Sequence, residues 1–387
     1  MTQQSYREAA TNTFNGLISQ YAGANVPASY WVLGHAFDSL LDYYDVIDPR
    51  STSADSVAQS VQRQYQNSLK NLGGYDAAWF DDFGWWTVAT QRAMSRSYFS
   101  SSTKSQLFLP ILTECWKRYT GNAPFVWERR GSDRFANYGP VVSGGIWNEY
   151  WFGTDASYAG PKDGDPSAMT LHGIQNTVSN ALYWIAAQRF AVTTSPDAGP
   201  VAENAYRFFR GWFEMSSNPL WWQQGPNAAL VRERVSHFAQ ATYPEDFLAK
   251  WATWAWVGDQ GLILGALVDR LSRALPGEQG PLLARARQLM VGVSSNLVGS
   301  DKTLKNWTTD NVPDGDTTDY STGKAVFWRN VLYTARNNAE LRAFLPQSGL
   351  LPVLLASADR VVGFPSIDII GATNDLATLV TASALLE

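Results

Sequence analysis

Apolar residues recur at helical spacing through nearly the whole chain, whereas alternating runs of β-branched residues are almost absent. One stripe consists of Leu33, Phe37, Leu40, Leu41 and Tyr44, which repeat at intervals of three and four residues. Because an α-helix completes a turn every 3.6 residues, such a stripe lies on one face and is broad enough to pack against a core. The chain is therefore predicted to be all-α.

Clusters of glycine, proline, asparagine and serine divide this pattern into twelve segments, because these residues end helices or begin turns. Twelve segments make six helical hairpins, and six hairpins closed into a ring form an (α/α)6 toroid. No linker-like stretch interrupts the chain, so residues 1–387 are expected to form a single catalytic domain. The predicted helices lie near 2–21, 29–46, 53–70, 80–99, 103–119, 168–191, 198–216, 246–274, 278–299, 322–342, 348–363 and 371–386.

Three long non-helical stretches, 120–166, 217–245 and 300–321, precede the sixth, eighth and tenth predicted helices. Successive helices of a hairpin run in opposite directions, so the three stretches open on the same rim of the toroid. Loops held by a rigid scaffold usually carry function. A cleft on this rim is the expected active site.

Composition excludes several classes of partner. Lys and Arg number 30 against 35 Asp and Glu, which gives a net charge of −5 and makes nucleic acid an unlikely partner. The longest apolar stretches fall short of the roughly 20 residues of a membrane span. The first residues lack the apolar segment of a secretory signal, so a cytoplasmic location is expected for the sequence as given. A monomer is expected.

Neither a metal nor a cofactor is predicted. His35, His172 and His237 do not have the spacing of a metal site, and the acidic run 310–319 lacks the glutamate that closes a calcium loop. The sequence contains no nucleophile elbow of the GxSxG type and no phosphate-binding loop. The single cysteine, Cys115, stands in the middle of a predicted helix and excludes an internal disulfide.

The carboxylate pair Asp81-Asp82 stands at the predicted start of the fourth helix, among Trp79, Phe80 and Phe83. One interpretation is helix capping, because acids in the first turn accept unpaired N–H groups and complement the helix dipole. The other is catalysis, because glycoside hydrolysis needs one ionised and one protonated carboxyl group. Adjacent residues on a helix diverge by about 100°, so the sequence leaves their separation open.

A series of motifs, in order from about residue 29 to the end, resembles glycoside hydrolase family 76, the α-1,6-mannanases. Each motif is short, and it is their order and spacing that carry the resemblance. They are Asp81-Asp82, Gly144-Gly145-Ile146-Trp147, the segment from Gln175 to Asn180, Asp259-Gln260-Gly261, Gly323-Lys324 with Phe327 and Arg329, and Asn374-Asp375-Leu376.

This resemblance implies an (α/α)6 toroid and a retaining glycosidase acting on α-mannosidic linkages, α-1,6 above all, in an oligosaccharide or polysaccharide. Asp81 would be the nucleophile and Asp82 the general acid/base. Tryptophans such as Trp151, Trp221 or Trp222 would stack on sugar rings. The further residues expected to bind the substrate are Gly145, Trp147, Asn176, Asn180, Asp259, Gln260 and Lys324.

A structural interpretation stands beside each of these assignments. Asn176 and Asn180, four residues apart on one helix face, also suit helix capping or backbone hydrogen bonds. Gly145 suits a tight turn, and Lys324 and Arg329 suit ion pairs at the rim. Two residues depart from the family pattern, with Asp259 in place of the usual Asn and Gln175 in place of the usual Lys.

Three other functions remain open. The same site would serve a transglycosidase if an acceptor sugar replaced water. The toroid would also serve a non-hydrolytic biosynthetic enzyme, a cyclase or isomerase acting on a hydrophobic small molecule, which fits the 13% aromatic content. A carbohydrate-binding protein without catalysis would need the aspartate pair only as a cap.

Overall fold

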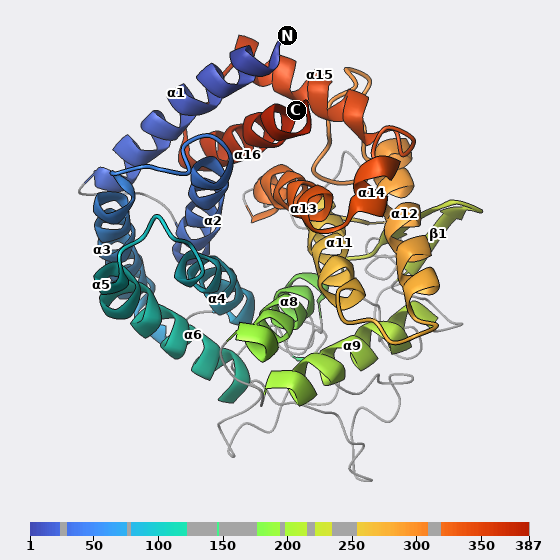
Figure 1. Cartoon of the computed structure of the whole chain (residues 1–387), viewed down its shortest axis with the longest axis horizontal. Helices are drawn as coiled ribbons and strands as arrows, with labels where there is room; N and C mark the ends of the chain where they lie inside the picture. The colour runs from blue at the N-terminus through green and yellow to red at the C-terminus, as the bar shows by residue number, and fades with distance from the viewer. Residues whose placement is uncertain are drawn as a thin grey trace, which may run out of the picture.

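A computed structural model describes residues 1–23, 29–75, 79–121, 145–146, 176–193, 198–214, 221–233, 254–308 and 319–386. In these residues the chain forms a ring of helices in two layers (Figure 1). Six inner helices follow one another around the axis, each packed against the next, and the last one packs against the first. They are α2 (Tyr30–Val46), α4 (Phe80–Met94), α8 (Thr177–Thr193), α11 (Val257–Leu271), α13 (Gly323–Asn337) and α16 (Ile369–Leu385).

The outer helices cover this ring, and each main outer helix precedes an inner helix along the chain. The predicted all-α (α/α)6 toroid is therefore confirmed. None of the described helices is both long and apolar enough to cross a membrane. The outer elements are α1 (Gln3–Ala22), α3 (Ala54–Leu72), α5 (Ser101–Thr103), the π-helical turn η2 (Lys104–Phe108), α6 (Leu109–Gly121), α9 (Ala198–Glu214), α12 (Gln279–Asn296), α14 (Ala339–Phe344) and α15 (Leu350–Gly363).

Burial follows the layer in which a helix lies. All 15 residues of α11 are buried, as expected for a helix enclosed on every side. In the outer helix α3, by contrast, the buried residues form a stripe at helical spacing that includes Val57, Val61 and Tyr65. The hydrophobic core therefore fills the space between the layers and between neighbouring inner helices.

Two glycines allow the inner helices to approach closely. A Cβ atom on Gly84 of α4 would lie 2.9 Å from the Leu182 Cβ on α8 and 2.9 Å from the Tyr119 hydroxyl. A Cβ on Gly261 of α11 would lie 2.6 Å from the Phe327 Cα on α13. Such distances are too short for any side chain, so glycine is required at both helix contacts.

The structure corrects several predicted boundaries. The helix predicted over 80–99 ends at Met94, and the one predicted over 322–342 divides at Asn338, whose side chain caps α14 by accepting the Leu341 N–H. Residues 254–256, predicted to be helical, are extended, and Trp256 forms an isolated antiparallel bridge with Trp307. The remaining differences in helix limits within the described residues are small.

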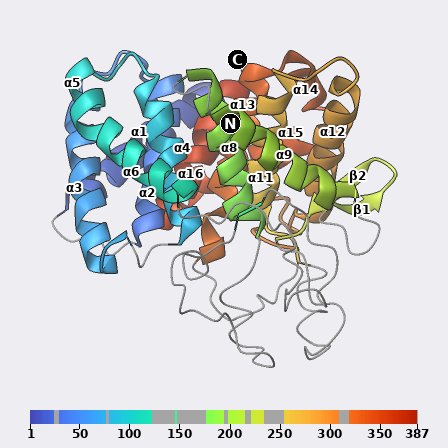
Figure 2. The same ribbon diagram turned by 90° about the horizontal axis from the view of Figure 1, so that it is seen from below.

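The stretch 217–245, predicted as a loop, contains a β-hairpin made of β1 (Trp221–Gly225) and β2 (Ala228–Val231). Strand β2 packs against α12, where a Cβ on Gly292 would lie 1.9 Å from the Ala229 carbonyl oxygen. Figure 2 shows the helical layers from the side, with this hairpin at the edge that carries α12.

Candidate active site

Hydrogen bonds connect the N-terminal ends of several inner helices around one rim of the ring. The 3₁₀ turn η4 (Asp319–Thr322) precedes α13, and there the Tyr320 carbonyl accepts the Trp256 indole N–H at 2.8 Å, which joins α11 to α13. Asn374 of α16 donates to the Ser321 carbonyl and accepts the Ala325 N–H, both at 2.8 Å. We call this set of helix starts, which also includes those of α4 and α8, the N-terminal rim.

Asp81 and Asp82 occupy the first turn of α4 at this rim. The Oδ2 atom of Asp82 accepts the backbone N–H of Trp79 at 3.1 Å, so this side chain caps its helix. Asp82 is 8% exposed, whereas Asp81 is half-buried. Asp82 therefore caps its helix, as one interpretation expected. Asp81 is the more exposed member of the pair.

Tyr119, at the end of α6, joins the aspartate pair to the neighbouring inner helix. Its hydroxyl donates to the Ser179 carbonyl in α8 and lies near enough to the Asp81 carboxylate to interact with it electrostatically. Burial raises the pKa of the Tyr119 phenol well above its usual range, and the Asp81 carboxylate adds to the rise. The phenol is thus a permanent hydrogen-bond donor. Sequence reasoning missed it, because only the packing of α4, α6 and α8 brings it to the rim.

Asn176 and Asn180 lie at the start of α8 and are 5% and 1% exposed. The Oδ1 atom of Asn176 accepts the Ser179 N–H at 3.2 Å, which caps the helix. Asn180 Oδ1 accepts the Ile146 N–H at 2.7 Å, and its Nδ2 donates to the carbonyls of Ile146 and Asn176. Both amide hydrogens of Asn180 are thus bonded to backbone carbonyls, and its expected contact with a sugar hydroxyl stays a prediction.

Asp259 and Gln260 lie in the first turns of α11, and both are fully buried. Gln260 Oε1 accepts the Val231 N–H at 2.7 Å, and its Nε2 donates to the carbonyls of Val231 and Trp256. Both amide hydrogens of Gln260 are bonded to backbone carbonyls, as those of Asn180 are, and its expected contact with sugar also stays a prediction. The fully buried Asp259 carboxyl likewise presents no surface to a ligand in this structure.

The remaining predicted residues fall into three groups. Gly145 is buried and precedes Ile146, whose backbone N–H donates to Asn180 of α8. Trp147 and Trp151 lie outside the described residues. Burial lowers the pKa of Lys324, with a further contribution from Arg360, and Asp301 and Asp375 oppose this change. Arg360 belongs to α15 and Asp375 to α16. The expected contact of Lys324 with substrate stays a prediction.

Trp221 and Trp222, adjacent in β1, have different surroundings. Trp221 is 7% exposed and packs edge-on against Phe213 at a centroid distance of 5.1 Å, so it belongs to the core rather than to a sugar platform. Trp222 is half-buried, with the Arg232 guanidinium 5.4 Å from its ring centroid. Of the two, Trp222 is the more exposed.

Arg329 does not lie at the rim. It is 4% exposed and donates to the His35 carbonyl at 2.9 Å and to the Ser39 hydroxyl at 3.0 Å. Its guanidinium also bonds to the His35 Nδ1, and burial together with this cation lowers the pKa of His35 well below its usual range. Arg329 therefore holds a neutral histidine and the middle of α2 in place.

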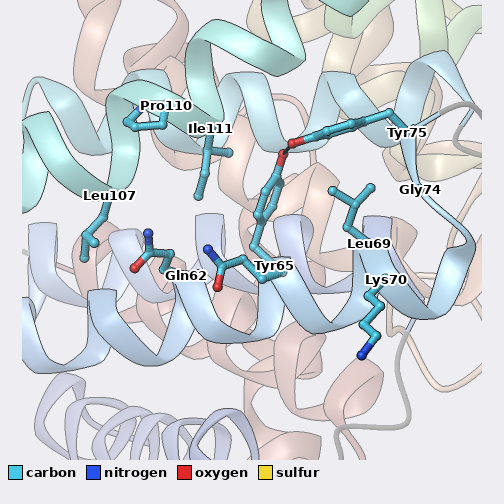
Figure 3. A pocket seen from close by; sticks show the side chains of 10 residues that line it. Gln62, Tyr65, Leu69, Lys70, Gly74, Tyr75, Leu107, Pro110 and Ile111 are labelled. Carbon is cyan, nitrogen blue, oxygen red and sulfur yellow. Dashed lines mark hydrogen bonds between the residues drawn. The ribbon is translucent and has the colours of Figure 1, made fainter.

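A separate groove of about 430 Å³ lies between the outer helices α3 and α6, where the Tyr65 and Tyr75 hydroxyls are 3.0 Å apart (Figure 3). Its lining is mainly apolar and includes Leu69, Leu107 and Ile111. None of these residues belongs to the N-terminal rim. Among the described residues, no group of three or more acidic, histidine or cysteine side chains is arranged to hold a metal.

Solved structures with the same arrangement of helices include α-1,6-mannanases. The GH76A α-1,6-mannanase of Salegentibacter sp. HEL1_6 superposes with a TM-score of 0.67 at 16% identity, covering 99% of this chain and 100% of that one. The fold is that of the family 76 glycoside hydrolases. No family model matches the sequence, and no curated protein matches it significantly.

Two further family 76-like structures extend this similarity. Dfg5 of Chaetomium thermophilum, solved in complex with glucosamine, has a TM-score of 0.66 at 15% identity and covers 100% of this chain and 91% of its own. A family 76 mannosidase of Bacteroides thetaiotaomicron has a TM-score of 0.57 at 10% identity, covering 98% of both chains. The order of the motifs in the sequence predicted a family 76 fold, and the structure has that fold.

Proposed function

We propose that this protein is a retaining glycosidase that cleaves α-mannosidic linkages, with α-1,6 linkages as its substrates. The observation that carries the proposal is the Asp81-Asp82 pair in the first turn of the inner helix α4, at the N-terminal rim of a family 76 fold. An inactive variant of the Salegentibacter enzyme, with two consecutive aspartates replaced by asparagine, was solved with α-1,6-mannotriose. That complex supports a role for an aspartate pair in this fold.

In the proposed mechanism, a carboxylate oxygen of Asp81 attacks the anomeric carbon as the glycosidic bond breaks. Asp82 gives its proton to the leaving oxygen. Because Asp82 Oδ2 accepts the Trp79 N–H, the transferred proton would sit on Oδ1. Water then attacks the anomeric carbon of the glycosyl ester, gives a proton to Asp82 and releases Asp81. Two displacements at one carbon retain its configuration.

The positive end of the α4 dipole assists this chemistry, because it stabilises the carboxylate that leaves when the ester is hydrolysed. Tyr119 stays neutral near Asp81, with its single hydroxyl hydrogen bonded to the Ser179 carbonyl, so it adds no charge beside the pair. Of the two β1 tryptophans expected to stack on a sugar ring, the half-buried Trp222 is the better candidate.

The test is incubation with linear α-1,6-mannooligosaccharides, with the products followed by anomer-resolved NMR. We expect the α-anomer to appear first with the wild type, and no product with Asp81→Asn or Asp82→Asn. Asp55→Asn is the matched control, because Asp55 also lies in the first turn of a helix but belongs to the outer helix α3. Initial release of the β-anomer, or full activity of Asp81→Asn, would overturn the mechanism.

The same assay separates hydrolysis from transglycosylation. Both pass through a glycosyl ester on Asp81, but transfer to a second sugar gives products longer than the substrate. Products no longer than the starting oligosaccharide support hydrolysis.

A further inference from the structure

A buried carboxamide stands at the same position in two inner helices. Asn180 is the fourth residue of α8, and Gln260 is the fourth residue of α11. They are 1% and 0% exposed. Each donates a 2.8 Å hydrogen bond to the carbonyl of the residue preceding its helix, which is Asn176 for Asn180 and Trp256 for Gln260. Each amide is thereby oriented by its own helix.

The other bonds of each carboxamide hold one residue of an incoming segment by both of its backbone groups. Asn180 is bonded to the N–H and the carbonyl of Ile146, at 2.7 and 3.0 Å. Gln260 is bonded to the N–H and the carbonyl of Val231, both at 2.7 Å. A carboxamide suits this task because it presents an acceptor and a donor side by side, as a peptide group does.

These two contacts are connected to the aspartate pair through α8. The segment after Val231 crosses to α8, where Thr177 donates its N–H to the Glu233 carbonyl at 2.7 Å and its hydroxyl to the Arg232 carbonyl at 2.6 Å. On the other side of α8, the Ser179 carbonyl accepts the Tyr119 hydroxyl beside Asp81. Two distant backbone segments and the Tyr119 side chain are thus fixed at one rim.

We propose that Asn180 and Gln260 are positioning residues of the active site, which hold the backbone at Gly145–Ile146 and at Val231–Glu233 against the starts of α8 and α11. Of these two helices, α8 packs against α4, which carries Asp81. This inference rests on the proposed function. It assigns the two residues no contact with substrate. Their effect on catalysis comes from the fixed position of the rim backbone, since a shift of about 1 Å in such a position can cost about 100-fold in rate.

The experiment compares isosteric variants that remove the carboxamides. Asn180→Leu and Gln260→Met each leave both backbone groups of one clamped residue without a partner. Gln188→Met is the matched control, because Gln188 is a carboxamide of α8 that is 2% exposed and donates to the Ala266 carbonyl of α11, far from the helix starts. Thermal unfolding of each variant confirms that it folds and measures its loss of stability.

Backbone hydrogen exchange is the readout that needs no substrate. We expect the Ile146 amide to exchange at least about 10-fold faster in Asn180→Leu, and the Val231 amide likewise in Gln260→Met, with neither accelerated in Gln188→Met. Unchanged exchange at both amides overturns the proposal. Equal acceleration in the control overturns it too, because the effect would then follow from general destabilisation.

The kinetic readout uses α-1,6-mannotetraose. We expect kcat/KM to fall by about 10- to 100-fold in Asn180→Leu and Gln260→Met, and to change by less than about twofold in Gln188→Met. Faster exchange with unchanged kcat/KM shows a purely structural role and overturns the proposal. If the wild type cleaves no mannoside, the proposed function fails, and the exchange data still decide whether the carboxamides hold these segments. The Asn180 and Gln260 contacts are separate. If one of the two variants does not fold, the other variant still tests the proposal.

Discussion

The two ends of the inner ring use opposite kinds of interaction. At the N-terminal rim, carboxamides and hydroxyls bond to backbone groups, and the acids lie in the first turns of helices. At the other end, Arg92 of α4 reaches three carboxylates of α2, with bonds of 3.0 Å to Asp38 and 2.8 Å to Asp45 and a further bond to Asp42. This ionic network borders a cavity of about 240 Å³ that is lined by both charged and apolar side chains.

The helix dipole explains part of this difference. Parallel inner helices present unpaired N–H groups and partial positive charge at one end, where anions are stabilised, and carbonyls at the other, where cations are stabilised. Asp81, Asp82 and Asp259 lie in first turns, whereas Arg92 and Arg336 lie in last turns. We infer that the N-terminal rim carries the proposed chemistry and that the opposite end stabilises the fold. The variants below test that division.

The largest effect is expected at the rim. Asp81→Asn should lower kcat on α-1,6-mannooligosaccharides by at least about 10⁴-fold, because the proposed covalent step needs an ionised carboxylate. Asp81 is half-buried at a helix start, where asparagine is also well tolerated. The unfolding temperature should therefore stay within about 2 °C of the wild type. A large loss of stability would contradict the division between the two ends.

The next effect is expected at the opposite end. Arg92→Met should destabilise the fold by about 3–5 kcal/mol, because it leaves buried carboxylates uncompensated. Asp42 and Asp45 have side-chain exposures of only 4% and 8%. Chemical denaturation measures the loss, and the kcat of the molecules that remain folded should match the wild type. A lower kcat in fully folded Arg92→Met would show that the network also serves the site.

A smaller effect is expected from the titration of Asp42. Burial raises the pKa of its carboxyl from 3.8 to about 6, with Asp38 adding to the rise and Arg92 opposing it. Between these pH values the folded state binds more protons than the unfolded state, so this group lowers stability as pH rises from about 4 to about 6. The change amounts to at most about 3 kcal/mol.

Asp42→Asn should remove this loss, which is measured as the difference in unfolding free energy between variant and wild type across that range. Asp38 and Asp45 do not interfere, because arginines and their hydrogen bonds lower the pKa of both carboxyls below 3.8, and their contribution is lost only in more acidic solution. Asp55→Asn, a change at the surface, is the control and should leave the profile above pH 4 unchanged. A difference that does not vary with pH would contradict the assignment to Asp42.

The smallest effect is expected from a single hydroxyl at the rim. Thr177→Val keeps the shape of the side chain and removes its bond to the Arg232 carbonyl, while the backbone bond to Glu233 remains. We expect a loss of about 1 kcal/mol in stability, measured by denaturation. A loss of unfolding free energy as large as that of Arg92→Met would show that the rim contributes as much to stability as the opposite end, against our inference.

Local patterns predicted the helices well, because helical periodicity depends on neighbours three and four residues apart. The predicted start of α4 at residue 80 is the observed one, and Asp82 caps it as one interpretation expected. The hairpin β1–β2 was missed because its strands are short and β2 packs on α12, a helix about 50 residues further along the chain. No local pattern records such a contact.

The sequence by itself determined the all-α ring, the rim at which the motifs gather and the aspartate pair, since each follows from short-range spacing and motif order. Only the tertiary structure decided what the motif residues do. Asn180 bonds to a residue 34 positions away and Gln260 to one 29 positions away, and Tyr119 reaches a carbonyl 60 positions away. The physical reason is that a polar side chain takes its role from its partner, and here the partners are brought in by the closure of the ring.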